Sequence, residues 1–229
     1  MSNLRRNAFF GFLIPLCLAT LPATAEEAAV TPEAIVEKAR IAFGHFAVDP
    51  DMSGFQNLLK TAKALLIMPE QFKAGFVLGG SGGTGVLLAR EGETDLWSHP
   101  AFYTMGAGSI GFQIGFQVAE LALLIMTKKG VNALLSTKVQ FGGDVSIALG
   151  PIGAGAHAAT TDVIAFSRTK GFYGGLSVEG AVITPRRKLN NRYYGEAVTP
   201  LDILIRRSVH NNGALSLVTE VAAAAQTHP

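Results

Sequence analysis

The chain has 229 residues, of which 48% are hydrophobic, and its 19 basic and 17 acidic side chains leave a formal charge of +2 at pH 7. A chain of this size and apolar content can bury a sizeable core as one domain, and its near-zero charge argues against nucleic acid as a partner. Its single cysteine, Cys17, excludes an internal disulfide and any site built from several cysteine ligands.

Residues 1–25 have the pattern of a cleaved signal peptide. An arginine pair precedes an apolar stretch over residues 8–21, and Ala23-Thr24-Ala25 is a small-residue cleavage sequence. The apolar stretch is shorter than the roughly 20 residues that a membrane-spanning helix needs. We therefore expect an exported protein, periplasmic or peripherally membrane-associated, whose mature chain begins at Glu26. Lipidation of Cys17 is the alternative.

Two amphipathic helices are predicted at the start of the mature chain. Thr31-Pro32-Glu33 combines an N-cap residue, a proline at the first helical position and an early acid. The apolar residues that follow share one face of this helix: Ile35, Ala39, Ala42, Phe43 and Phe46. A second helix from about Ser53 would turn Phe55, Leu58, Leu59 and Ala62 inward. Such helices pack on a sheet; membrane binding by the first is the alternative, although its polar face is mixed rather than basic.

From Ala64 to about Tyr194 the chain is predicted to be mainly β-strand, with one helix at about residues 129–135. Ile110, Phe112, Ile114 and Phe116 alternate with Gly111, Gln113 and Gly115. A period of two indicates a strand with one buried face, and glycine on the other face is typical of strands that bend or lie against another layer.

The last part of the chain returns to helix. Thr199-Pro200 caps a short one, and residues 214–225 form a longer one with Leu215, Leu217, Val218 and Val221 inward. The predicted fold class is therefore α+β. A curved, glycine-rich, mostly antiparallel sheet or partial barrel is covered by N-terminal and C-terminal helices in a single domain over residues 26–229.

Two glycine runs match the dinucleotide-binding pattern G-x-G-x-x-G, at Gly80–Gly85 and at Gly106–Gly111. That chemistry requires a helix N-terminus directly after the glycines, where it meets the pyrophosphate. Each run is followed by a strand pattern instead, and neither is followed by the Gly-Lys-Ser/Thr of a Walker loop. We predict no nucleotide binding and no cofactor.

Gly79-Gly80-Ser81-Gly82-Gly83 matches the nucleophile pattern G-x-S-x-G, and Asp95 and His99 follow in the order of a hydrolase triad. The pattern works only where a strand turns into a helix at the serine. Serine hydrolysis through Ser81 is therefore the less favoured alternative, and we predict that the protein is not an enzyme. The histidines are isolated in the sequence, so we expect no dedicated metal site.

Basic side chains concentrate in the second half of the chain. Residues 26–127 hold six Lys/Arg and eleven Asp/Glu, whereas residues 128–207 hold eleven Lys/Arg and five Asp/Glu. The densest group has no acid between Glu179 and Glu196. Its candidate anion-binding residues are Arg186, Arg187, Lys188 and Arg192, with Tyr193 and Tyr194 as amphipathic rings and Lys128 and Lys129 as further cations. The alternative interpretation is a solvated turn between strands.

Several of these segments resemble the SYLF-domain family in order and spacing. They are Lys63–Pro69, Lys73–Phe76, Trp97-Ser-His-Pro-Ala-Phe-Tyr103, Gly111–Gly115, Gly150-Pro151 and Tyr194-Gly195. The resemblance covers roughly residues 35–205 and implies a lipid-binding domain without catalytic residues. Eukaryotic members bind phosphoinositides, and some bind actin.

This chain departs from those members in its secretion signal and in the acidic start of its mature sequence, which puts phosphoinositide specificity in doubt. The function we expect is non-enzymatic binding of anionic phospholipid at an envelope membrane surface. The alternative is a structural envelope protein that acts through a protein partner.

Overall fold

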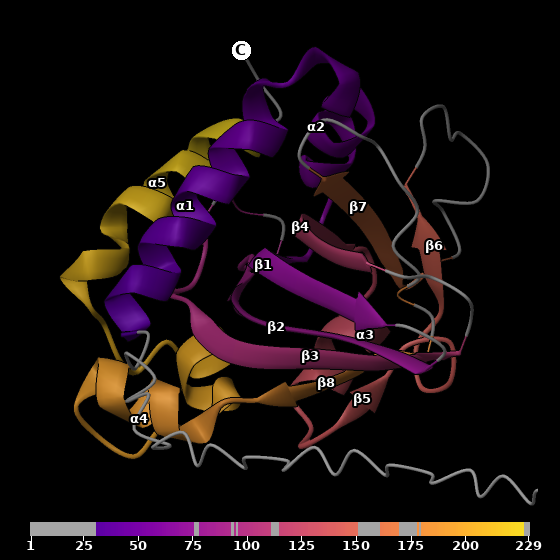
Figure 1. Cartoon of the computed structure of the whole chain (residues 1–229). Helices are drawn as coiled ribbons and strands as arrows, with labels where there is room; N and C mark the ends of the chain where they lie inside the picture. The colour runs from indigo at the N-terminus through magenta and orange to yellow at the C-terminus, as the bar shows by residue number, and fades with distance from the viewer. Residues whose placement is uncertain are drawn as a thin grey trace, which may run out of the picture.

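The computed structural model describes residues 31–75, 78–92, 94, 96–110, 115–150, 161–169, 178 and 180–226. One eight-stranded sheet curls into a half-barrel, with helices packed against it (Figure 1). The predicted fold class, a single α+β domain with a curved sheet, is confirmed.

The sheet has the strand order β5-β8-β3-β2-β1-β4-β7-β6. Its neighbours pair antiparallel except β6 and β7, which are parallel, so the sheet is mostly antiparallel as predicted. The strands are β1 (Ala64–Gly75), β2 (Leu78–Ala89), β3 (Ala101–Ile110), β4 (Gly115–Ile125), β5 (Val139–Gln140), β6 (Ile147–Leu149), β7 (Val163–Thr169) and β8 (Val182–Pro185).

The helices are α1 (Pro32–Val48), α2 (Ser53–Leu59), α3 (Lys128–Leu134), α4 (Arg187–Tyr194) and α5 (Leu215–Ala224), with a π-helix at Asp202–Arg206 and 3-10 turns at Pro50–Met52 and Asn212–Ala214. The predicted N-cap is present, since the Thr31 hydroxyl accepts a hydrogen bond from the Ala34 amide at 3.2 Å. Leu215, expected to face inward, is 50% exposed because it opens α5.

Residues 187–194 were expected to continue the β region but form α4. The helix is specified by tertiary contacts rather than by an apolar stripe, since Asn190 and Tyr193 are its buried residues. It ends at Gly195, whose φ of 75° is the left-handed conformation that glycine adopts most easily at a helix C-terminus.

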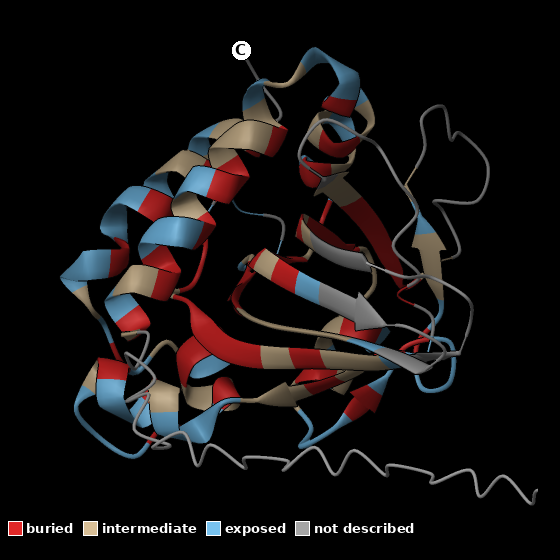
Figure 2. Cartoon of the chain, in the orientation of Figure 1, coloured by how far each residue is buried: buried red, intermediate tan, exposed pale blue. Residues whose placement is uncertain are grey.

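Side chains alternate between two buried layers across the sheet. On β1, Leu65 and Ile67 point into one layer with α1, α2 and α5, and we call this side the α1 face. Leu66 and Met68 point into a second layer that includes Leu134 of α3, and we call it the α3 face. Ala64–Met68 is buried throughout (Figure 2), which explains its continuous apolar sequence.

A β-bulge interrupts β1 between Ile67 and Gln71, relative to both neighbouring strands. Two glycines of β2 make room for it. A Cβ on Gly85 would lie 2.0 Å from the Ile67 carbonyl oxygen, and one on Gly83 would lie 2.5 Å from that of Glu70. These glycines therefore serve the close approach of backbone that a bulge requires.

Candidate functional site

Helix α4 is fixed to the start of β3 by its inner side chains. The Asn190 Oδ1 atom accepts a 2.7 Å hydrogen bond from the Phe102 amide, inside the protein. The Tyr193 ring packs edge-on against Phe102, with centroids 5.1 Å apart, and the Tyr194 hydroxyl donates to the Pro100 carbonyl at 2.7 Å. These contacts present the opposite side of α4 to solvent.

The four predicted cations of this region lie on that outer side. Arg186, Arg187, Lys188 and Arg192 are all exposed, and none forms an ion pair with any residue that the structure describes. Arg186 reaches across β3, where its Nη1 atom donates to Oγ1 of Thr84 and of Thr104, each at 3.2 Å. These four cations therefore share an exposed surface on and beside a helix, rather than in a turn between strands.

Several other cations in the described part of the chain are paired with carboxylates. Lys38 Nζ lies 2.8 Å from Glu70, Arg40 contacts both Glu37 and Glu220, and Arg207 lies 2.6 Å from Glu91. The cations around α4 lack such partners in the described structure. Moreover, Arg187 and Lys188 lie in its first turn, where the helix dipole disfavours positive charge. The charges of Arg187 and Lys188 therefore do not stabilise the helix, whereas Arg192 lies in its last turn, where the dipole favours positive charge.

The structure places Tyr193 and Tyr194 in the packing beneath the cations rather than on an exposed rim. Tyr193 is 4% exposed, and Tyr194 is half-buried. Burial, with a smaller contribution from the Glu33 charge, raises the pKa of Tyr193 to about 12. Both rings therefore anchor α4, a role that their position beside a charge run did not reveal.

Lys128 and Lys129 lie apart from the α4 cations. Helix α3 follows β4 and helix α4 follows β8. Both strands end at the same end of the sheet, so both helices start there. Three strands, β3, β2 and β1, separate β8 from β4, which corresponds to about 19 Å along the sheet. Lys129 is also engaged in an ion pair with Asp162, at 3.0 Å. The two groups of cations are not one contiguous patch.

Asp162 is the centre of a buried network that sequence reasoning missed. Its carboxylate accepts hydrogen bonds from the Thr127 hydroxyl at 2.6 Å and from the amide and hydroxyl of Ser146 at 3.0 and 2.9 Å. Burial by itself raises the pKa of Asp162, but these hydrogen bonds and that from Lys129 outweigh it and hold the pKa well below its usual range. Nothing in the sequence connects residues so far apart.

The described parts of the glycine runs, including Ser81, lie within β-strands. Gly80–Gly85 lies within β2, and Gly106–Ile110 lies within β3, whereas Gly111 and Asp95 fall outside the described residues. Ser81 pairs with Ala107. His99 lies before the start of β3 and eight positions (107 − 99) before Ala107. Eight residues of extended chain span about 26 Å, so His99 is far from Ser81. The strand–turn–helix that a nucleophilic serine needs is absent at Ser81.

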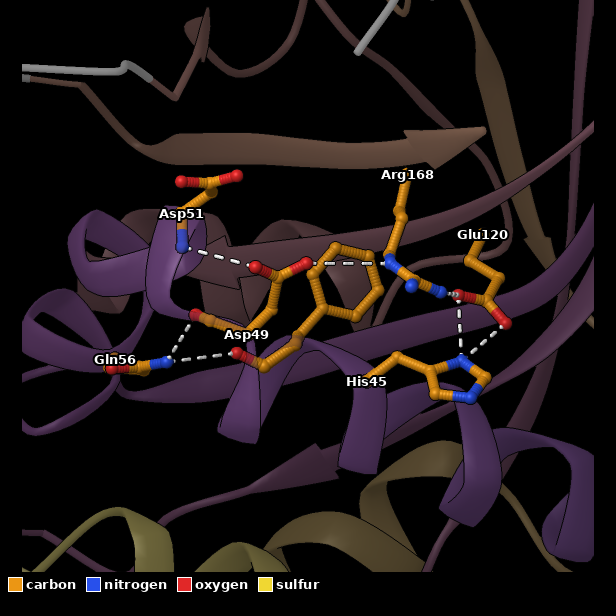
Figure 3. Close-up of polar contacts among 7 residues, drawn as sticks. His45, Asp49, Asp51, Gln56, Glu120 and Arg168 are labelled. Carbon is orange, nitrogen blue, oxygen red and sulfur yellow. Dashed lines mark hydrogen bonds and ion pairs between the residues drawn. The ribbon is translucent and has the colours of Figure 1, made fainter. Parts of the chain in front are cut away.

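A second polar cluster joins the end of α1 to the sheet (Figure 3). His45 Nδ1 lies 2.8 and 3.0 Å from the two oxygens of Glu120 on β4. Arg168 on β7 contacts Glu120 at 3.4 Å and Asp49 at 3.6 Å. The Gln56 side-chain amide donates to the Asp49 carbonyl at 2.8 Å. Each member contacts another element, so the cluster holds α1 and α2 on β4 and β7.

The described residues offer neither a metal-binding cluster nor a membrane-spanning helix. They contain no group of three or more histidine, cysteine or acidic side chains arranged to hold a metal ion. No helix among them combines the length and the apolar character needed to cross a bilayer.

The fold is that of a single α+β domain with an exposed cationic surface, and comparison with known proteins gives its family. Residues 106–224 match the family model Ysc84, described as Las17-binding protein actin regulator. The chain belongs to this family, also called SYLF, as its motifs predicted.

The chain is 34% identical over 159 residues to LAS seventeen-binding protein 3 of Saccharomyces cerevisiae (strain S288c), covering 66% of this chain and 34% of that protein. It is 28% identical over 161 residues to SH3 domain-containing YSC84-like protein 1 of Homo sapiens, covering 68% and 46%. The matched region thus spans a third to a half of these relatives. No solved structure matches the chain.

Proposed function

We propose that this protein is a non-enzymatic binding protein of the cell envelope, which attaches to anionic phospholipid through the cations around α4. The observation that carries the proposal is the set of four exposed cations, Arg186, Arg187, Lys188 and Arg192, without carboxylate partners in the described structure. Each basic side chain near an anionic membrane surface contributes about 1 kcal/mol of binding free energy, and this contribution falls as salt rises.

Co-sedimentation with vesicles tests the proposal. The protein should bind vesicles containing phosphatidylglycerol at low salt, bind them much less at high salt, and bind neutral phosphatidylcholine vesicles poorly at both. Arg187→Glu with Lys188→Glu should weaken binding to anionic vesicles more than tenfold. A matched control reverses two exposed cations elsewhere, Lys60→Glu with Lys138→Glu, and should bind nearly as the wild type does.

Absence of wild-type binding to anionic vesicles, or equal binding by the two double variants, would reject the proposal. A protein partner is the second candidate, because relatives are named as Las17-binding proteins and as an actin regulator. It would gain support if the wild type ignored vesicles of both kinds while the α4 variant lost a partner that the control variant kept.

The envelope location is part of this proposal, and it rests on the signal-like pattern of residues 1–25. The intact mass of the exported protein tests it. A chain beginning at Glu26 is expected, whereas a chain that retains an acylated Cys17 would show lipid anchoring instead.

A further inference from the structure

The Arg186 guanidinium is held in a defined position on the α1 face of the sheet. Thr84 of β2 and Thr104 of β3 lie opposite each other, with their hydroxyl oxygens 3.4 Å apart, and Nη1 donates to both. Nε and Nη2 make no hydrogen bond to a described residue. The nearby Glu70 carboxylate is bound to Lys38 at 2.8 Å. A positioned cation with unused donors is suited to an oxyanion.

Beside this threonine pair, the α1 face continues as backbone with few side chains. Gly82 and Gly106 are paired across β2 and β3, and so are Gly80 and Gly108. Phe72 of β1 lies opposite Gly82 and is 44% exposed. From Thr84 to Gly80 this surface extends about 13 Å along the strands. Along the strands, a cation and two hydroxyls are followed by a flat surface of glycine backbone, and the Phe72 ring lies beside this surface at the level of Gly82. This arrangement matches the charged head and apolar tail of an amphiphile.

Packing does not explain these four glycines. Among the described residues, a Cβ would meet nothing closer than 3.7 Å at Gly80, 3.6 Å at Gly82 and 3.9 Å at Gly106, and nothing within 4 Å at Gly108. Their φ angles are not positive, unlike that of Gly195. Glycine weakens a strand, so residues that are not needed for close packing cost stability without a structural return. A ligand that lies close to the backbone would account for them.

We propose that this face binds one molecule of an anionic phospholipid. Its phosphate would contact Arg186 and the hydroxyl of Thr84 or Thr104, and its glycerol and the first part of an acyl chain would lie over the glycine pairs toward Phe72. The charge of the unpaired guanidinium selects the phosphate, and the surface beyond it selects the apolar part. This inference rests on the proposed function. It assigns Arg186 to holding one lipid molecule, and Arg187, Lys188 and Arg192 to attracting the membrane surface.

Titration with dihexanoyl phosphatidylglycerol below its micelle concentration tests the site, because no membrane surface is then present. Saturable one-to-one binding is expected by calorimetry. Arg186→Gln and the pair Thr84→Val with Thr104→Val should each weaken it at least fivefold. Gly82→Val with Gly106→Val should weaken it more than tenfold with an unchanged or raised melting temperature, since valine favours strands. Gly44→Ala, in α1 where a Cβ meets nothing, is the control and should bind as the wild type does.

Two further measurements distinguish binding at this site from attraction to the membrane surface and from binding of a free phosphate group. Arg187→Glu with Lys188→Glu should lose vesicle binding but bind the short-chain lipid within twofold of the wild type. Glycerol phosphate should bind at least tenfold more weakly than the lipid. The site is rejected if the lipid does not saturate, if folded Gly82→Val with Gly106→Val binds it normally, or if glycerol phosphate binds equally well. Short-chain binding without vesicle binding would instead reject the proposed function alone.

Discussion

Buried polar side chains do much of the positioning in this domain. The Ser98 hydroxyl accepts a hydrogen bond from the Ala89 amide at 2.9 Å. The neighbouring Trp97 is buried, and the Arg90 guanidinium lies over its ring, 5.1 Å from the ring centroid. The segment from Trp97 to Tyr103, a specific part of the family resemblance, is therefore a packed corner between β2 and β3. Its residues specify the fold, whereas the residues proposed for binding are the exposed cations around α4 beside it.

Asp162→Asn should change how stability depends on pH. The folded-state pKa of Asp162 is depressed, so the charged carboxylate stabilises the protein above its ordinary pKa near 3.8, and this contribution is lost as pH falls below that value. Removing one partner of a buried charge network costs about 3 kcal/mol. We expect the variant to be less stable at pH 7 and the difference to shrink toward pH 3, as measured by urea unfolding. Asp144→Asn, at an exposed site, is the control, and parallel pH curves for wild type and Asp162→Asn would contradict the assignment.

Asn190→Ala should detach α4 from β3. The change leaves the buried Phe102 amide without its acceptor, at a cost of about 2 kcal/mol. Chemical denaturation measures the loss, and Lys188→Ala on the exposed side of the same helix should stay within about 0.5 kcal/mol of the wild type. Equal stabilities of the two variants would mean that Asn190 does not anchor the helix.

At the scale of elements, the sequence predicted the helices and strands that are specified by neighbouring residues, and it missed a helix that depends on tertiary contacts. The Thr31-Pro32 cap, the apolar stripe of α1 and the strand pattern around the two glycine runs each depend on a few neighbouring residues, and these elements were found. The alternating segment predicted over residues 110–116 lies mainly outside the described residues. Helix α4 was missed because its inner face is polar or amphipathic, with Asn190 and Tyr193 bonded or packed against β3.

The candidate site was predicted in part for the same reason. A run of cations is visible in the sequence, but Thr84 and Thr104, which hold Arg186, lie more than 80 residues from it. Likewise the bulge of β1 and the pairing of glycines across β2 and β3 follow from register, which no single segment encodes.

The glycines of β2 should separate into two classes when each is replaced by alanine. A Cβ on Gly85 would approach a backbone oxygen to 2.0 Å, and the backbone cannot yield as a flexible side chain would, so Gly85→Ala should unfold the protein or cost more than about 3 kcal/mol. Gly82→Ala has room and should be neutral or stabilise by up to about 1 kcal/mol. Guanidinium unfolding of both variants measures the contrast, and similar losses would mean that Gly82 is also required by the fold.

At the scale of the whole molecule, α4 and α2 lie at opposite ends of α1 (Figure 1). The 17 residues of α1 separate them by about 25 Å. The four cations without a carboxylate partner among the described residues are at the α4 end. At the α2 end, Arg168 pairs with Asp49 and Glu120, and His45 contacts Glu120. An anionic surface should therefore attract the molecule in one orientation, with α4 toward the lipid.

Amide hydrogen exchange with and without anionic vesicles should report that orientation. Backbone amides of α4 and of the start of β3 should exchange several-fold more slowly when vesicles are present, because attachment suppresses the local opening that exposes them. Amides of α2 serve as the internal reference and should be unaffected. Raising the salt should remove the protection at α4, since exposed charges are screened within about 8 Å at physiological ionic strength and over shorter distances above it. Protection centred on α2, or protection at α4 that persists at high salt, would show that these cations do not direct the molecule to the membrane.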